Sequence, residues 1–206
     1  SARTKATRLP GKAFLDLGGR TVTERLIERL KLAKEAQLIM LCTSTNPDDR
    51  ALVEIARRAG IEAFCGNEDD KLDRYLQASR QFGMDFAGFV DGDDPFCDPG
   101  YIDRIIRRAR EGDADYIRCT GLPVGVGANG VRATALERVC AIKTERDTEV
   151  WGGYFTQTGL FRVEEVTADP AHPAPELRMT LDYPEDYAFF QAVSRELHIP
   201  GRTFSL

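Results

Sequence analysis

The chain has 206 residues, of which 42% are hydrophobic and 30% are charged, so it is long enough for one domain with a substantial buried core. This composition excludes a disordered or fibrous protein. The 28 basic and 33 acidic residues give a net charge of −5, which argues against broad nucleic-acid binding, and the two histidines lie too far apart for a histidine-rich metal site.

The first half of the chain alternates amphipathic and short apolar segments. Helical spacing of apolar residues predicts helices over residues 21–36, 47–59, 70–82 and 101–110. Short apolar runs predict buried strands over residues 38–42, 61–65, 86–90 and 116–119. This strict alternation predicts a three-layer α/β fold, in which helices cover both faces of a mostly parallel sheet.

The alternation breaks after Cys119. The glycine-rich stretch GVGANG, residues 125–130, is read equally well as a mobile loop over the acceptor or as a turn, and a helix is expected over 133–143. The sequence WGGYFTQTGLFRV then predicts a β-rich insertion near 145–165. Pro184 is well placed to open a last helix that runs to about His198.

The five cysteines show no C-x-x-C pair and no metal-ligand spacing. Most are expected to be buried, reduced thiols of a cytoplasmic protein. No apolar run approaches the roughly 20 residues of a membrane helix, and no apolar segment follows the basic N-terminus as in a signal peptide. We therefore expect a cytoplasmic protein without membrane partners.

The opening ARTKATRLPGKAF is the strongest functional signal. Arg3, Lys5, Arg8 and Lys12 all precede the first acidic residue. Ligands of parallel sheets bind at the carboxyl ends of the strands, where a basic loop can clamp a polyphosphate. The alternative is a solvated basic tail.

Acidic residues follow the third predicted strand in FVDGDDPF. Asp91, Asp93 and Asp94 offer hard oxygen ligands for Mg²⁺, which is commonly shared with nucleotide phosphates. Asp182, in LRMTLDYPEDY, is placed to join them on one metal. The alternatives are an acidic turn that caps the next helix and, for Asp182, a helix N-cap.

Five segments in this order resemble the cytidylyltransferases that activate acidic sugars. They are R-x4-R-L-P-G-K, S-T-N-P-D-D-x-x-L-V-E-I-A, F-x-G-N-E-D-D-K-L-D-R-Y, D-G-D-D-P-F-x-D-P and L-R-M-T-L-D-Y-P-E-D-Y. That family includes acylneuraminate and 3-deoxy-manno-octulosonate cytidylyltransferases and the spore-coat polysaccharide branch, to which the resemblance is greatest. The resemblance covers about residues 2–119 and 176–197.

The resemblance implies a fold of the nucleotide-diphosphosugar-transferase type and transfer of CMP from CTP to an acidic, nonulosonate-like sugar for surface polysaccharide biosynthesis, with Mg²⁺ and release of pyrophosphate. By position, the phosphate-binding catalytic residues are Arg3, Arg8 and Lys12, and the metal ligands are Asp93 and Asp182. The residues that fall where the family holds base and ribose are Thr43, Ser44, Gly66, Asn67, Asp73 and Arg74.

The acceptor site is expected in the region 120–165, where the resemblance is thinnest. Its polar candidates are Arg118, Asn129, Arg132, Glu145 and Gln157. The same region could form a β-arm that pairs with a second subunit, as in dimeric relatives, or an edge strand of the same sheet.

Two departures from the family stand at the start of the chain. Lys5 and Ala6 replace the family's usual glycine and small hydroxyl residue, which removes one phosphate hydrogen bond. The family's first strand, which delivers this loop, should precede Ser1. We therefore expect a single domain over 1–206 whose first strand lies upstream, because a parallel sheet without it would expose apolar faces and unpaired backbone groups.

Two other functions are compatible with these motifs. The sequence D-G-D resembles the metal motif of glycosyltransferases that use nucleotide-sugar donors, although such enzymes have less use for the R-L-P-G-K loop. Ala6 is compatible with a nucleotide- or sugar-binding module that has lost turnover.

Overall fold

The structure, a computed structural model, describes residues 1–172, 174–197 and 204. The described helices are α1 (Val22–Leu30), α2 (Arg50–Ala59), α3 (Lys71–Gln81), α4 (Pro99–Glu111), α5 (Ala133–Ile142), α6 (Gly153–Thr156) and α7 (Pro184–Leu197), with 3-10 turns at Lys12–Phe14 and Pro47–Asp49. The described strands are β1 (Met40–Ser44), β2 (Glu62–Gly66), β3 (Phe86–Phe89), β4 (Tyr116–Thr120), β5 (Asn129–Arg132) and β6 (Val163–Thr167).

Local capping explains where several helices begin and end. Thr21 and Glu24 form a reciprocal capping box at the start of α1. Asp70 and Asp98 accept hydrogen bonds from the first turns of α3 and α4. Gly60 ends α2 in the left-handed conformation, with φ of 65°. The four predicted helix–strand pairs of the first half are therefore confirmed within a few residues, except that α1 ends at Leu30.

The strands form two sheets. Strands β1 and β2 pair in parallel, and the second sheet has the order β3-β5-β4-β6. Strand β5 runs antiparallel to both of its neighbours, whereas β4 and β6 are parallel. The connection 121–128 is too short for the crossover of a dozen or more residues that a parallel partner needs, which explains this reversal. The α/β class is confirmed, with a sheet that is split and mixed.

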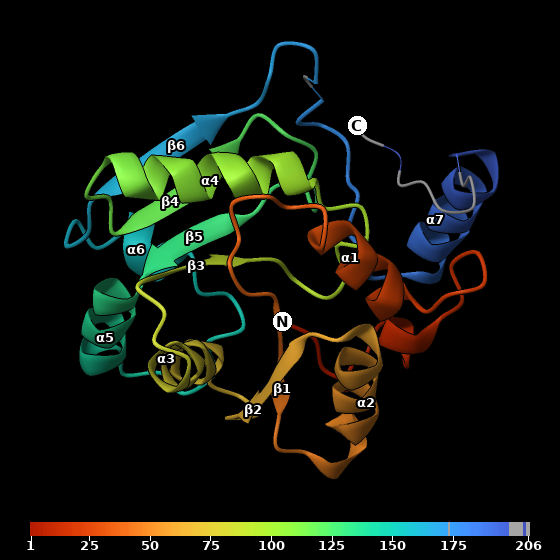
Figure 1. Cartoon of the computed structure of the whole chain (residues 1–206), viewed down its shortest axis with the longest axis horizontal. Coiled ribbons are helices and arrows are strands. Elements are labelled where there is room, and N and C mark those ends of the chain that lie inside the picture. The colour runs from red at the N-terminus through yellow and green to blue at the C-terminus, as the bar shows by residue number, and fades with distance from the viewer. Residues whose placement is uncertain (173, 198–203, 205–206) are drawn as a thin grey trace.

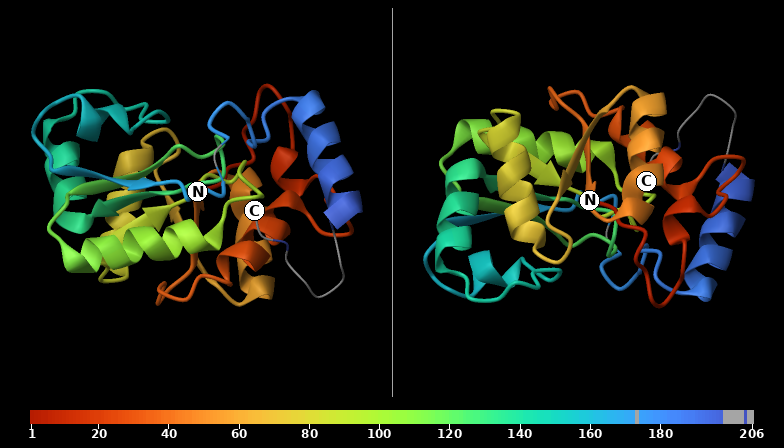
Figure 2. Two further views of the ribbon diagram at one scale, coloured as in Figure 1. Left: turned by 90° about the horizontal axis from the view of Figure 1, so that it is seen from above. Right: turned by 90° about the horizontal axis from the view of Figure 1, so that it is seen from below.

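Helices cover both faces of the larger sheet (Figures 1 and 2). On one face, α4 packs Ile102 and Ile105 against Ile117 in a cluster that also includes Leu26 of α1. On the other face, α3 and α5 share a cluster with aromatic residues from 151–161. Two layers of helix therefore enclose the strands, as the alternation predicts.

The prediction of a β-rich insertion near 145–165 is wrong. Residues 153–156 form the short helix α6, and β6 begins only at Val163. Trp151, Phe155 and Phe161 are buried in the core beside Tyr116, which stacks on Phe155 at 5.1 Å. Burial of these rings decides the conformation, and the strand propensity of the threonines and aromatics is overridden. The described residues of this stretch form no β-arm.

The glycine-rich stretch 125–130 begins in a packed turn and continues into β5, which starts at Asn129. The backbone N–H of Val124 donates to Leu177 O at 3.0 Å, and that of Met179 donates to Val124 O at 2.7 Å. Gly125 has φ of 91° and lies against the backbone of Met179, so a side chain there would collide with it. Of its two readings, the turn is the one observed.

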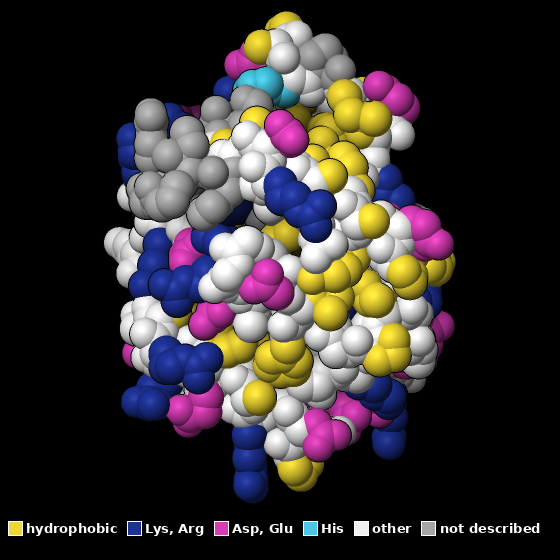
Figure 3. Space-filling view, turned by 90° about the vertical axis from the view of Figure 1, so that its right-hand side faces the viewer, with side chains coloured by type: hydrophobic (Ala, Val, Ile, Leu, Met, Phe, Trp, Pro, Cys, Tyr) yellow, Lys and Arg dark blue, Asp and Glu magenta, His cyan; other side chains and the backbone are white. Residues whose placement is uncertain are grey.

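The remaining expectations concern the cysteines, the surface and the last helix. All five thiols are free, with Cys42 and Cys97 buried but Cys65 exposed. Figure 3 shows one face, on which Lys and Arg side chains are interleaved with Asp and Glu. No helix among the described residues is long and apolar enough to cross a membrane. Helix α7 begins at Pro184 as predicted, and its expected end at His198 lies outside the described residues.

Candidate functional site

The opening basic loop lies at the carboxyl ends of β1 and β3. The Ser1 amine donates to Val90 O at 2.5 Å, and the Ala2 N–H donates to Cys42 O at 3.1 Å, so the chain enters the loop between the two strands. A pocket of about 250 Å³ opens there. Its charged lining residues are Arg3, Lys5, Arg8, Lys12, Lys71, Arg74, Asp91, Asp93, Glu149 and Asp182.

Lys12 is the central cation of this pocket. Its Nζ donates to Asp93 Oδ2 at 2.8 Å, to Asp182 Oδ1 at 2.9 Å and to Leu181 O at 2.8 Å. Burial alone would lower the pKa of Lys12, but pairing with Asp93 and Asp182 outweighs it and raises that pKa. Residues 170 positions apart thus converge on a single positive charge.

Asp182 receives two further cations. Arg8 donates to its Oδ1 and Arg178 to its Oδ2, each at 2.7 Å. Both guanidinium groups also lie over the ring of Tyr183, that of Arg8 at 5.2 Å from the centroid. Burial opposes the charge of Asp182, but these donors and Lys12 hold its pKa below the usual range. Asp182 is therefore an ionised anchor for three basic side chains.

Three carboxylates beside Lys12 offer a place for a divalent cation. One ligand oxygen from each of Asp91, Asp93 and Asp94 lies within 4.8 Å of the others. Burial and the neighbouring charges of Asp93 and Asp91 raise the pKa of Asp94 well above its usual value. Asp93 and Asp182 already share one cation, the Lys12 ammonium. All are hard oxygen donors, so the residues fit Mg²⁺ or a similar ion.

A second cation–carboxylate group faces the basic loop. Lys71, whose side chain is 4% exposed, donates to Asp91 Oδ1 at 2.6 Å and to Glu149 Oε1 at 3.5 Å. Arg3 donates to Glu149 Oε2 and to Glu68 O, each at 2.5 Å. Glu149 thus neutralises two cations of the pocket. The sequence did not single out Glu149 or Arg178, and it included Lys71 only within the stretch Gly66–Arg74, which falls where the family holds base and ribose.

Asp49 fixes the basic loop to the end of β1. Its Oδ2 accepts from the hydroxyls of Thr43 at 2.8 Å and Ser44 at 2.6 Å, and its Oδ1 accepts from the N–H and hydroxyl of Thr4. Burial acts against its charge, but these donors lower the pKa of Asp49 to about 2. Sequence reasoning missed Asp49, which stands in the quoted motif S-T-N-P-D-D. The predicted nucleotide-binding hydroxyls of Thr43 and Ser44 are engaged with it.

The other predicted nucleotide-binding residues lie around the end of β2. Arg74 lines the pocket, and its Nη1 donates to Asn67 O at 2.5 Å. The buried Nε of Arg74 has no protein partner among the described residues. Asn67 accepts from the start of α3, and Gly66 ends β2 against the Arg74 side chain. Asp73 lies in the first turn of α3 and does not line this pocket.

None of the five predicted acceptor residues lines the pocket formed by the described residues. Arg118 pairs with Glu165, Asn129 accepts from Tyr116 at 3.0 Å, and Glu145 accepts from Tyr154 at 2.6 Å. Arg132 donates to three backbone carbonyls at and beyond the end of α4. Gln157 is exposed just after α6. The structure does not bring these residues together with the basic loop.

Known proteins are similar to this chain in both sequence and fold. The family model for cytidylyltransferases matches residues 1–158. The chain is 28% identical over 199 residues to the spore coat polysaccharide biosynthesis protein SpsF of Bacillus subtilis, covering 93% of this chain and 83% of that protein.

Two solved structures have the same fold. A cytidylyltransferase from Leptospira borgpetersenii superposes with a TM-score of 0.87 at 24% identity, over 96% of this chain and 85% of that one. A CMP:2-keto-3-deoxy-manno-octonic acid synthetase complexed with CTP superposes with a TM-score of 0.74 at 15% identity, over 95% and 96% of the two chains.

Proposed function

We propose, from the premise that the chain belongs to the cytidylyltransferase family, that it transfers CMP from CTP to a hydroxyl of an acidic, nonulosonate-like sugar and releases pyrophosphate. The transfer of CMP to a sugar-like acceptor follows from the family. The acidic sugar and a role in surface polysaccharide biosynthesis are our proposal, supported by the similarity to SpsF. The D-G-D motif was the reason for considering a glycosyltransferase, and it lies inside residues 1–158, which match the cytidylyltransferase family. The motif therefore no longer supports that alternative.

The observation that carries the proposal is the Lys12 ammonium held between Asp93 and Asp182. Arg3 and Arg8 flank it on the same loop, so three cations face the pocket where a triphosphate would lie. Preorganised positive groups stabilise the charge that develops on the phosphates and on the leaving pyrophosphate. Arg3 and Arg8 suit this role because a guanidinium donates two parallel hydrogen bonds to phosphate oxygens.

Acidic residues balance these cations in the free protein. Asp182 pairs with Lys12 and Arg8, Glu149 with Arg3 and Lys71, and Asp91 with Lys71. A bound divalent cation, Mg²⁺ in our proposal, would be held by Asp93 and Asp182 with the neighbouring carboxylates, and would supply charge neutralisation and a lower pKa for the attacking hydroxyl. Lys12 would then serve phosphate oxygens.

We place cytosine and ribose at the carboxyl ends of β1 and β2. Arg74, with its unpartnered buried Nε, and Asn67 lie there. The hydroxyls of Thr43 and Ser44 contribute through Asp49, which holds the basic loop in place. Asp73 and the acceptor residues of 120–165 stay as predictions, and so does a homodimer through that region.

Pyrophosphate release tests this function. CTP with Mg²⁺ is assayed against UTP, ATP and GTP, each with acidic sugars and with neutral sugars of matched size. We expect release only with CTP and an acidic sugar. Release with neutral sugars alone would refute the acceptor class. If CTP at about 100 times its Kd stabilises the fold by roughly 2.7 kcal/mol but no sugar gives pyrophosphate, the protein is a binding module.

A further inference from the structure

Lys71 is a buried cation on the wall of the pocket beside the basic loop. It is the first residue of α3, and its side chain is only 4% exposed although it lines this pocket. Lysine is rarely buried, and the N-terminus of a helix carries a partial positive charge that disfavours a cation. The stability of α3 therefore does not explain a lysine at this position.

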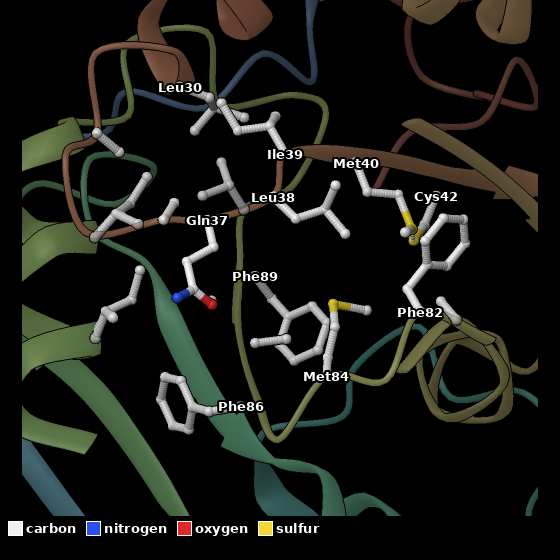
Figure 4. A pocket seen from close by; sticks show the side chains of 18 of the residues that line it. Leu30, Gln37, Leu38, Ile39, Met40, Cys42, Phe82, Met84, Phe86 and Phe89 are labelled. Atoms are coloured by element: carbon white, nitrogen blue, oxygen red, sulfur yellow. Dashed lines mark hydrogen bonds between the residues drawn. The ribbon is translucent and has the colours of Figure 1, made fainter. Parts of the chain in front are cut away.

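The surroundings of Lys71 direct its ammonium group into the pocket. Tyr75, one turn further along α3, lines an apolar cavity of about 640 Å³. The side chains of Leu38, Met84 and Phe89 line the same cavity (Figure 4). Because a charged group needs polar partners, the stem of Lys71 runs past this apolar region and its ammonium group meets its partners on the pocket side.

Glu149 takes the position of an anion between Lys71 and Arg3. Its Oε1 accepts from Lys71 at 3.5 Å and its Oε2 accepts from Arg3 at 2.5 Å. Each carboxylate oxygen thus faces one cation, as two oxygens of one phosphate group would. The Glu149 side chain is half exposed, and its contact with Lys71 is long. A phosphate group in the pocket can therefore replace Glu149 at both cations.

Asp91 is the second partner of Lys71. Its Oδ1 accepts from Lys71 at 2.6 Å, and one of its oxygens belongs to the carboxylate group formed with Asp93 and Asp94. Sites for two divalent cations place the ions roughly 3.5–4 Å apart on such neighbouring carboxylates. Here Asp91 already pairs with a cation that is part of the chain, whereas Asp93 pairs with Lys12.

We propose that Lys71 is a built-in cation of the phosphate site: it contacts a phosphate group in place of Glu149 and neutralises Asp91, so the carboxylates bind one divalent cation rather than two. The single ion would lie at Asp93 and Asp182, as in the proposed function, on which this inference rests. Lys71 supplies a point charge where a second ion would otherwise be needed. Because α3 and Asp91 hold its side chain, this charge is in place before the nucleotide binds.

Binding of inorganic tripolyphosphate, a probe without base or ribose, tests the phosphate contact. In calorimetric titrations with EDTA present, its affinity should fall roughly tenfold or more in Lys71→Met, which removes the charge and keeps an unbranched side chain. Lys143→Met is the matched control. Lys143 is similarly buried and pairs with Asp70 at the start of α3, but it does not line the pocket. The control should bind tripolyphosphate as the unaltered chain does.

The number of bound divalent cations tests the second part of the proposal. Mn²⁺ bound per chain is measured by equilibrium dialysis at saturating tripolyphosphate. We expect one ion in the unaltered chain and in Lys143→Met. We expect two ions in Lys71→Met, because Asp91 has then lost the cation that neutralises it.

Either no ion or two ions in the unaltered chain would overturn the proposal, and this measurement holds even if Lys71→Met fails to fold. An unchanged tripolyphosphate affinity or a single ion in Lys71→Met would overturn it too. An equal loss of affinity in Lys143→Met would mean that Lys71 forms only a structural ion pair.

None of these measurements uses CTP or a sugar, so this inference and the proposed function can fail separately. Pyrophosphate release from CTP and an acidic sugar by a chain that binds two ions would refute only this inference. The expected tripolyphosphate and Mn²⁺ results, without release from CTP and any sugar, would refute only the proposed function.

Discussion

Replacing Asp49 with asparagine tests how the basic loop is fixed to the sheet. The carboxylate is buried, and it accepts five hydrogen bonds from Thr4, Thr43 and Ser44. Asparagine keeps one acceptor oxygen and turns the other into a donor. The three donors on Oδ2 would then face an NH₂ group, and the charge that they stabilise would be gone.

The pKa gives the size of the effect. A fall from 3.8 to about 2 corresponds to about 2 kcal/mol of differential stabilisation of the charged form, at 1.36 kcal/mol per unit. For a chain of this size we expect Asp49→Asn to lower Tm at pH 7 by about 4–8 °C. Asp48→Asn is the matched control, because Asp48 is the adjacent acid and is exposed.

The pH dependence supplies the refutation. A lowered folded-state pKa gives stability that is complete above the unfolded value of 3.8 and is lost as the pH falls through about 2. The difference in unfolding free energy between Asp49→Asn and the unaltered chain should therefore shrink from pH 5 to pH 2 in urea titrations. If it stays constant over this range, or if Asp48→Asn behaves alike, the charge of Asp49 does not hold the loop.

Two further predictions concern catalysis. Asp93→Asn removes a carboxylate charge from the proposed cation site. We expect CTP-dependent pyrophosphate release to fall by roughly 100-fold or more. An unchanged rate with an unchanged Mg²⁺ dependence would exclude Asp93 from that site. Glu149→Gln removes a negative charge that pairs with Arg3 and Lys71, so these two cations become available to the phosphates of CTP. In a titration of nucleotide binding, we expect CTP to bind about fivefold more tightly, which corresponds to roughly 1 kcal/mol. The control variant Glu54→Gln changes an exposed ion pair outside the pocket and should leave CTP affinity unchanged. Weaker binding by Glu149→Gln would mean that Glu149 supports the nucleotide.

The sequence predicts the helix–strand pairs of the first half well because the signals are local. Apolar periodicity and caps such as Thr21, Asp70 and Gly60 act within a few residues. Residues 151–163 defeat the same reasoning, because the burial of Trp151 and Phe155 is a tertiary event. The antiparallel direction of β5 is partly predictable, because the connection 121–128 is too short for a parallel crossover from β4. The strands with which β5 pairs, β3 and β4, cannot be predicted from the sequence.

The site shows the same division. Motifs predicted that the basic loop binds phosphate and that Asp93 and Asp182 bind a metal. In the structure, both aspartates pair with Lys12 of that loop. Lys71 and Glu149 are 78 residues apart, and no pattern along the chain pairs them. Asp49 resembles any acid at the start of a helix until the fold brings Thr4 to it. Ion pairs between residues far apart in the sequence form only when the fold brings the carboxyl ends of the strands together.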